Sequence, residues 1–163
     1  MTLSWSDSYF GQLRALAGDR TLLLTATRVV ARDEAGRVLL IQRADNGVWS
    51  VPAGAMELGE SVADCASREL WEETGLRAAE LTPFALHTGP AYTSANMFGD
   101  TYQHFVVLFR ADKWHGELVR ATDETTDAGF FPAAEPPEPL SRTVAETLAD
   151  LASFEANGQL VVK

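Results

Sequence analysis

The order of the predicted helices and strands indicates an α/β fold in which a mixed β-sheet lies between covering helices. Helical periodicity is found near both ends and in the middle of the chain. Runs rich in Val, Thr and Leu, typical of strands, separate these segments. The length of 163 residues, 46% of them hydrophobic, suits one domain over residues 1–163 with a buried core.

The N-terminal residues predict a short helix. In residues 6–17 the side chains of Tyr9, Leu13 and Leu16 fall on one side at helical spacing. This side is expected to pack on the rest of the domain. The alternative is a contact with a second copy of the chain through three aromatic residues, Trp5, Tyr9 and Phe10.

Three strands are expected between this helix and the middle of the chain. Residues 21–31 and 37–43 are β-prone and are separated by a turn at 33–36, so they predict a β-hairpin. Residues 48–51 predict a third, short strand.

A helix over residues 61–74 is the most clearly marked element. Ser61 followed by Asp64 fits a capping box, and Gly75 stands where a left-handed C-terminal residue belongs. The apolar side of this helix is expected to pack on a sheet and consists of Val62, Ala63, Ala66 and Leu70.

Three glutamates on the same helix form the candidate metal site. Glu69, Glu72 and Glu73 stand at i, i+3 and i+4, so their carboxylates project from one face. These charges repel one another, and a hard dication with oxygen ligands, Mg²⁺ or Mn²⁺, removes the repulsion. A solvated acidic face is the alternative for these residues taken alone.

The second half of the chain predicts two strands, a long loop and a final helix. The strands are expected at residues 80–87 and 102–111, and the loop between them is expected either to touch substrate or only to connect the strands. An acidic loop at 120–127 leads into a short strand that ends at Pro132. The helix is expected over about 141–156 with four inner residues, Val144, Leu148, Leu151 and Phe154.

Composition narrows the function classes. The net charge of −10 argues against a nucleic-acid-binding surface. The chain lacks a membrane-length apolar run and a signal peptide, so a cytoplasmic location is expected. The single cysteine, Cys65, fits a reducing compartment and a packing role. No mutual metal-ligand spacing relates the three histidines, which are expected to pack or lie on the surface: His87, His104 and His115.

Residues 54–76 resemble the signature of the Nudix hydrolases, G-x5-E-x7-R-E-L-x-E-E-x-G-L. The chain matches every fixed position: Gly54, Glu60, Arg68, Glu69, Leu70, Glu72, Glu73, Gly75 and Leu76. The resemblance extends over about residues 21–132 and implies the Nudix fold, an α/β/α sandwich. The chain departs from the family at Ala53, where relatives often have Gly, but Ala still offers a backbone carbonyl.

The resemblance implies roles for the residues of this signature. Glu72 and Glu73 would be the principal metal ligands, and Glu69 a further ligand or the general base. Arg68 would orient these carboxylates through Glu60. The backbone carbonyl of Ala53 is a further expected metal ligand.

Residues outside the signature complete the predicted site. A loop carboxylate often joins the metal cluster or acts as base in relatives, and Glu124 is the candidate here, with Asp123 as substitute and a solvated turn as the alternative. The sequence does not choose between Glu69 and Glu124 as the base. Phosphate and base contacts are predicted for four residues: Arg43, Tyr92, Phe98 and Tyr102.

The function implied by the resemblance is Mg²⁺- or Mn²⁺-dependent hydrolysis of a nucleoside diphosphate linked to another group. Relatives with the same signature act on nucleotide sugars such as ADP-ribose, on nucleoside triphosphates or on dinucleoside polyphosphates, and are often homodimers. The alternative is a non-catalytic Nudix module that binds a nucleotide as a sensor or partner-binding domain. The three intact carboxylates favour the hydrolase.

Overall fold

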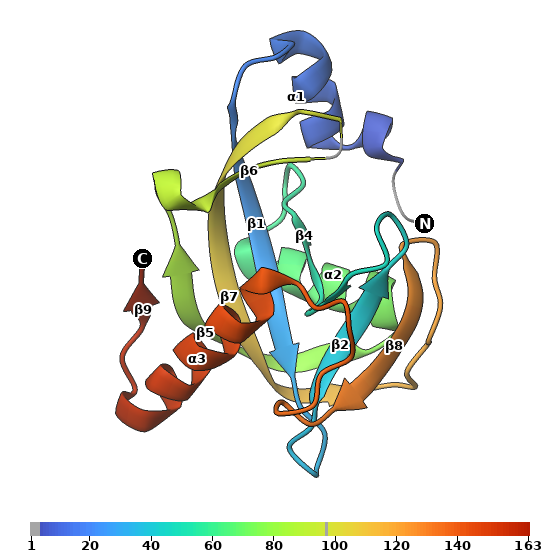
Figure 1. Ribbon diagram of the computed structural model, residues 1–163, viewed down its shortest axis with the longest axis vertical. Coiled ribbons are helices and arrows are strands. Elements are labelled where there is room, and N and C mark those ends of the chain that lie inside the picture. The colour runs from blue at the N-terminus through green and yellow to red at the C-terminus, as the bar shows by residue number, and fades with distance from the viewer. Residues whose placement is uncertain (1–3, 97) are drawn as a thin grey trace.

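The computed structural model describes residues 4–96 and 98–163 as three α-helices, two short 3-10 helices and nine strands (Figure 1). The helical elements are η1 Trp5–Asp7, α1 Tyr9–Ala17, α2 Val62–Thr74, η2 Pro90–Tyr92 and α3 Arg142–Asn157. The strands are β1 Leu22–Ala31, β2 Val38–Arg43, β3 Trp49–Ser50, β4 Ala53–Ala55, β5 Arg77–His87, β6 Thr93–Ala95, β7 Thr101–His115, β8 Thr125–Phe131 and β9 Val161–Val162.

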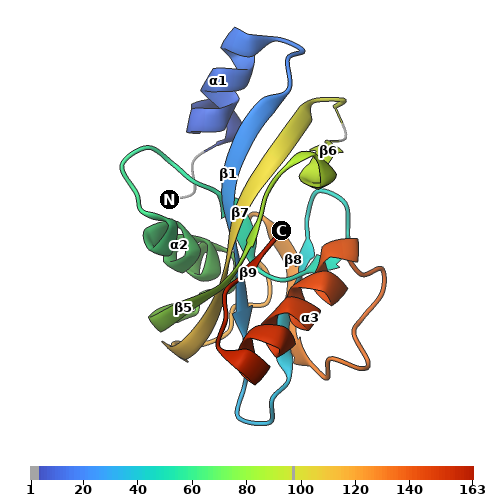
Figure 2. The ribbon, with the colours of Figure 1, turned by 90° about the vertical axis from the view of Figure 1, so that its left-hand side faces the viewer.

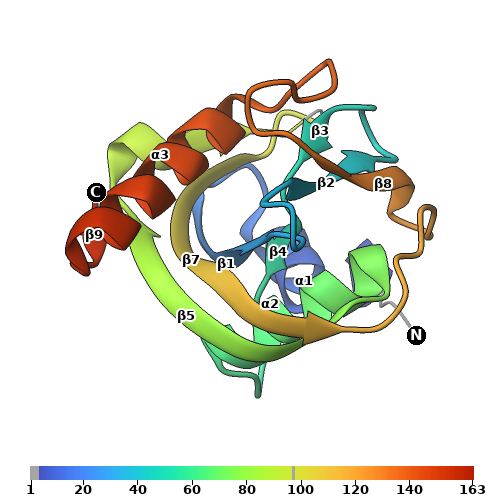
Figure 3. The ribbon, with the colours of Figure 1, turned by 90° about the horizontal axis from the view of Figure 1, so that it is seen from below.

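The strands form two sheets. The larger has six strands in the order β4-β1-β7-β5-β9, with β6 paired to β7, and it is mixed because β1 runs parallel to β7 and β9 parallel to β5. The smaller has the order β3-β2-β8. Figure 3 shows β7 and β5 curving together along one side of the molecule, with β2 and β8 on the other side of β1. The predicted α/β fold with a mixed sheet is confirmed.

The predicted hairpin of β1 with β2 is wrong. The turn exists, since the Gly36 N–H donates to the Asp33 carbonyl at 2.9 Å, but only the bridge between Arg32 and Val38 connects the two strands. β1 pairs instead with β7 along its whole length and with β4 from Ala26 to Arg28. Because β1 has partners at both edges, β2 has to join another sheet.

Two helices cover opposite faces of the larger sheet, as Figure 2 shows for α2 and α3. On the α2 side, Ala66 and Leu70 pack with Val29 and Val107 in one hydrophobic cluster. On the α3 side, the second cluster contains Val30, Phe84, Val106, Leu108, Val144 and Leu151. Since neighbouring residues of a strand point to opposite faces, β1 and β7 contribute to both clusters.

The terminal helices match their predicted positions more closely than their predicted inner faces. In α1 the predicted inner residue Leu16 is 87% exposed, whereas Phe10 is buried. Burial of Phe10 also removes it from the predicted contact surface with a second copy. In α3, Val144 and Leu151 are fully buried as expected.

Short strands were missed, and one predicted strand begins earlier than expected. β6 lies in the long loop before β7, and β8 begins inside the predicted acidic loop. β9, at the C-terminus, adds to the edge of β5. β8 and β9 pair with strands far away in sequence, which local propensity does not report, whereas β6 pairs with β7, the next strand along the chain. None of the helices in the described part of the chain is long and apolar enough to span a membrane.

Candidate active site

Helix α2 carries the centre of the candidate site, and its ends are fixed as predicted. The Ser61 side chain accepts from the Asp64 N–H while the Asp64 carboxylate accepts from the Ser61 N–H, and Gly75 adopts a left-handed φ of 74°. A side chain at Gly75 would also approach Val119 Cγ2 to 2.7 Å. The predicted apolar face needs one correction, because Ala63 is exposed and the buried residue is Cys65.

The glutamate face of α2 is buried against the chain, not solvated. Glu69 is 6% exposed and Glu73 is 3% exposed. Glu124, from the loop before β8, joins them, and one oxygen from each of the three carboxylates lies within 4.8 Å of the other two. The structure therefore brings together residues about fifty positions apart that the sequence proposed for the same cluster.

Arg68 holds the carboxylates around it in place. Its guanidinium donates to both oxygens of Glu60, at 2.7 and 3.0 Å, and to the backbone carbonyl of Ala55 at 3.0 Å. It also donates to Glu69 at 2.6 Å and to Glu72 at 3.1 Å. The Arg68 guanidinium thus contacts Glu60, Glu69 and Glu72 together, and its orienting role stays a prediction.

Strand β4 packs its backbone directly against the carboxylates. A Cβ atom at Gly54 would lie 2.0 Å from the carboxyl carbon of Glu69, so a larger residue there requires the Glu69 side chain to move. The Ala53 N–H donates to the Glu73 carboxylate at 2.9 Å. The metal-ligand role of the Ala53 carbonyl stays a prediction.

Burial and crowding raise the pKa of the clustered carboxyls. Burial raises the pKa of Glu69 to about 7, against the opposing effect of Arg68. Burial and then the charge of Glu69 raise the pKa of Glu73 well above its usual range, and burial with the charge of Glu72 raises that of Glu124. The pKa of Glu60 is lowered instead. Burial alone would raise this pKa, but the hydrogen bonds from Arg68 and from the Glu57 N–H outweigh that effect.

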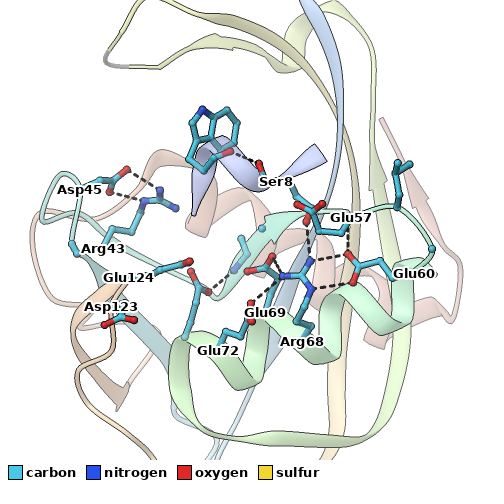
Figure 4. Close-up of a pocket in the computed structure, with 18 residues that line it drawn as sticks. Ser8, Arg43, Asp45, Glu57, Glu60, Arg68, Glu69, Glu72, Asp123 and Glu124 are labelled. Atoms are coloured by element: carbon cyan, nitrogen blue, oxygen red, sulfur yellow. Dashed lines mark hydrogen bonds and ion pairs between the residues drawn. The ribbon is translucent and has the colours of Figure 1, made fainter. Parts of the chain in front are cut away.

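A cavity of about 930 Å³ opens over this cluster, within the size range of small-molecule sites. Its lining includes Arg68 and the glutamates of the signature, the loop carboxylates Asp123 and Glu124, and Arg43 with Asp45. Figure 4 shows Arg43 and Asp45 across the cavity from Arg68 and Glu60, with Glu124 between the two pairs. The Arg43 guanidinium makes two hydrogen bonds to Asp45, at 2.9 and 3.0 Å, which help to raise its pKa.

Three of the four predicted substrate contacts do not line this cavity. Tyr92 stacks on His87 and donates to Glu146, and Tyr102 is 5% exposed beneath the Arg14 guanidinium. Phe98 is 81% exposed. Only Arg43 is at the cavity, and the role of the other three in substrate binding stays a prediction.

Sequence reasoning missed several lining residues, chiefly Trp5, Ser8, Asp45 and Glu57. Glu57 occupies a variable position of the signature, and its charge was the one available signal. Trp5 and Ser8 come from an N-terminal segment that reaches the cavity only through tertiary packing.

The clustered carboxylates have the chemistry of a divalent-cation site. Glu69, Glu73 and Glu124 supply hard oxygen donors at short mutual distances. Among the described residues, the Arg68 guanidinium donates a hydrogen bond to Glu69, and no basic side chain does so to Glu73 or Glu124. Buried carboxylates with so little compensation hold a negative charge only at a cost, which a dication would offset. The residues present therefore fit Mg²⁺ or Mn²⁺.

Comparison with known proteins extends over most of the chain. The family model described as the NUDIX domain matches residues 22–151. A MutT-like protein of Streptomyces ambofaciens is 34% identical over 124 residues, which is 75% of this chain and 71% of that protein. The NAD-capped RNA hydrolase NudC of Pseudomonas aeruginosa strain LESB58 is 37% identical over 107 residues, 64% of this chain but 34% of NudC. The chain thus spans about a third of the length of that relative.

Solved structures show the same fold. The crystal structure of a MutT NUDIX hydrolase from Burkholderia pseudomallei superposes with a TM-score of 0.66 at 22% identity. The superposition covers 81% of this chain and 99% of that one. At this level of identity the likeness concerns the fold alone.

Proposed function

The chain belongs to the Nudix hydrolase family, and we propose that it hydrolyses the phosphoanhydride bond of a nucleoside diphosphate linked to a second group. The products would be a nucleoside monophosphate and a phosphorylated remainder. The observation that carries this proposal is the gathering of Glu69, Glu73 and Glu124 in one cavity that also contains Arg43.

A phosphoanhydride is difficult to attack because its oxygens are negatively charged and repel a nucleophile. When bound, Mg²⁺ or Mn²⁺ would neutralise these oxygens and lower the pKa of a water molecule. Glu69 and Glu73 would hold the ion, and Glu72, which lines the same cavity, is the proposed additional ligand. Arg68 forms ion pairs with Glu69 and Glu72 and so fixes the rotamers of both side chains.

Arg43 is proposed to bind the phosphate groups. It lies in the cavity, and its guanidinium is already oriented by Asp45. A guanidinium can donate two parallel hydrogen bonds to a phosphate, which suits the anionic substrate despite the net negative charge of the chain.

Glu124 is proposed as the general base that accepts a proton from the attacking water. Glu69 is buried and bound to Arg68, whereas Glu124 is the exposed member of the cluster and so can meet a water molecule. We expect Glu124→Gln to lower kcat with little effect on Mn²⁺ binding. Equal losses of kcat and Mn²⁺ affinity would instead make Glu124 a ligand.

The function is tested by measuring phosphate release with a coupled phosphatase across nucleotide sugars, nucleoside triphosphates and dinucleoside polyphosphates. In Mg²⁺ we expect the wild type to hydrolyse one of these classes and Glu72→Gln to lose most of that activity. Glu34→Gln, in the exposed turn after β1, is the matched control and should retain it. Tight nucleotide binding without turnover of any substrate would support a non-catalytic binding module.

A further inference from the structure

The N-terminal segment of residues 5–17 contributes to the cavity although it lies outside the matched family region, which begins at residue 22. This segment comprises η1 and α1, and Trp5 and Ser8 from it line the cavity. Figure 4 shows Ser8 near Glu57 and across the cavity from α2. The family signature therefore does not account for this wall of the site.

One end of the segment is attached to the signature loop. The Tyr9 N–H donates to the Glu57 carboxylate at 2.9 Å. The Glu57 N–H in turn donates to Glu60 at 2.7 Å, and Glu60 binds Arg68. A continuous chain of hydrogen bonds thus connects the start of α1 with the residue that orients the catalytic carboxylates.

The other end of the segment is attached to the larger sheet. Arg14 donates to the Tyr102 hydroxyl at 3.2 Å and to the Thr101 carbonyl at 3.1 Å, and it lies 3.4 Å from Asp100. Phe10 is 2% exposed between these attachments. Helix α1 is therefore held at its start by Glu57 and near its end by Thr101 and Tyr102, and Trp5 lies shortly before its start.

The side chain held at the cavity is an indole. Trp5 is 52% exposed, and it is the one aromatic residue among the described residues that line the cavity. Its backbone is fixed, since its carbonyl accepts from the Ser8 hydroxyl at 2.8 Å, and a Cβ atom at Gly11 would lie 1.8 Å from the same oxygen. Apart from Leu58, the other lining residues are charged or small. A large aromatic ring left open at such a cavity is suited to a flat, apolar ligand surface.

We propose that Trp5 is the stacking surface for the nucleobase of the substrate, and that residues 5–17 form the base-binding wall of the active site. The inference rests on the proposed function, because it assigns the two halves of a nucleotide to two sides of one cavity. The carboxylates with their cation, and Arg43, take the diphosphate, and Trp5 takes the base. Stacking on an aromatic side chain tolerates different bases, so Trp5 provides affinity for nucleotides as a class.

The test compares two probes that differ by the base. Binding of AMP and of inorganic pyrophosphate in Mg²⁺ is measured by calorimetry for the wild type, Trp5→Ala and Trp5→Phe. We expect Trp5→Ala to weaken AMP binding about tenfold and to leave pyrophosphate binding unchanged, with Trp5→Phe close to the wild type. Trp71→Ala is the matched control, since Trp71 is 40% exposed on α2 and packs under the Arg77 guanidinium outside the cavity.

Three results would overturn the proposal: unchanged AMP binding by Trp5→Ala, equal weakening of both probes, or a changed oligomeric state without a change in AMP affinity. Hydrolysis kinetics separate this failure from failure of the proposed function. If the wild type hydrolyses a nucleotide and Trp5→Ala has the same KM, only the stacking role is wrong. If the wild type hydrolyses none of the nucleotides, the proposed function is wrong whatever Trp5 binds.

Discussion

Two clusters of ligand-type side chains lie on opposite sides of the larger sheet, and they differ in how their charge is balanced. On the α2 side the cluster is Glu69, Glu73 and Glu124, and on the α3 side it is His87, Glu146 and Asp150. In both, three potential ligand atoms lie within 4.8 Å of one another. By residue type and distance alone, either could hold a metal ion.

The α3 cluster is neutralised by the chain itself. Lys163 Nζ lies 2.8 Å from Asp150 and 3.0 Å from Glu146, and His87 Nε2 lies 2.7 Å from the other Asp150 oxygen. Tyr92 donates a further hydrogen bond to Glu146 at 2.9 Å. This cluster connects β5, α3 and the C-terminal strand, so its chemistry is that of a structural ion-pair network.

Among the described residues, the α2 cluster has weaker compensation, since Arg43 acts on Glu73 and Glu124 by charge without a hydrogen bond to either. Glu73 receives one backbone hydrogen bond, from Ala53, and Arg68 reaches Glu69 at the edge of the cluster. Burial and mutual repulsion accordingly raise the pKa of all three carboxyls. A site for a cation is recognised here by the charge that the protein leaves unbalanced.

The largest expected effect is the loss of activity in Glu73→Gln. Removing this carboxylate takes a ligand from the cation, and we expect kcat to fall roughly 10³-fold, about 4 kcal/mol of transition-state stabilisation. The free energy of unfolding without metal should stay the same or rise, because a buried charge is removed while the amide oxygen can still accept from Ala53. Activity assays and urea denaturation in EDTA measure the two quantities. A Glu73→Gln protein that keeps the wild-type kcat would show that the α2 cluster is no more needed for activity than the α3 cluster.

Asp150→Asn should have the opposite profile. The carboxylate of Asp150 is 5% exposed and pairs with both His87 and Lys163, so its neutralisation is expected to lower the free energy of unfolding by about 3 kcal/mol. The activity of the remaining folded enzyme should be within about twofold of the wild type. A large drop in kcat at full stability would show that the α3 cluster is functional.

A smaller change is expected from Gly54→Ala. The added Cβ would overlap the Glu69 carboxylate, so that side chain has to rotate while the fold is kept. We expect kcat to fall about tenfold, equivalent to ~1.4 kcal/mol. Steady-state kinetics at saturating Mg²⁺ measure the loss. Glu34→Gln, in the exposed turn after β1, is the control and should keep the wild-type kcat.

The smallest effect is expected for the thiol of Cys65, which lies beneath the α2 cluster. Burial raises the pKa of Cys65 to about 12, so almost no thiolate is present at pH 8 in the folded protein. We expect iodoacetamide to label Cys65 only after unfolding and to leave activity intact, as followed by mass spectrometry. Rapid labelling of the native protein at pH 8 would mean that the helix opens.

The sequence predicted the parts of the site that local rules determine. The capping box at Ser61, the left-handed residue Gly75 and the shared face of the glutamates follow from helix geometry, and the structure has all of them. The position of Glu124 was proposed by analogy, and the structure places it in the cluster.

Contacts between distant segments were beyond such rules. Nothing in residues 21–43 reports that β1 has partners at both edges, so the predicted hairpin was wrong. Tyr92 faces α3 because Glu146 and His87 hold it there, and Trp5 reaches the cavity because Glu57 anchors α1. Tertiary contacts decide all three.

The most direct test of the account is Mn²⁺ binding without nucleotide, followed by electron paramagnetic resonance of the free ion. We expect the wild type and Asp150→Asn to bind Mn²⁺ with the same affinity, and Glu73→Gln to bind at least tenfold more weakly. A Glu73→Gln protein that binds Mn²⁺ as the wild type does, or loss of binding in Asp150→Asn, would contradict the assignment of the α2 cluster as the cation site.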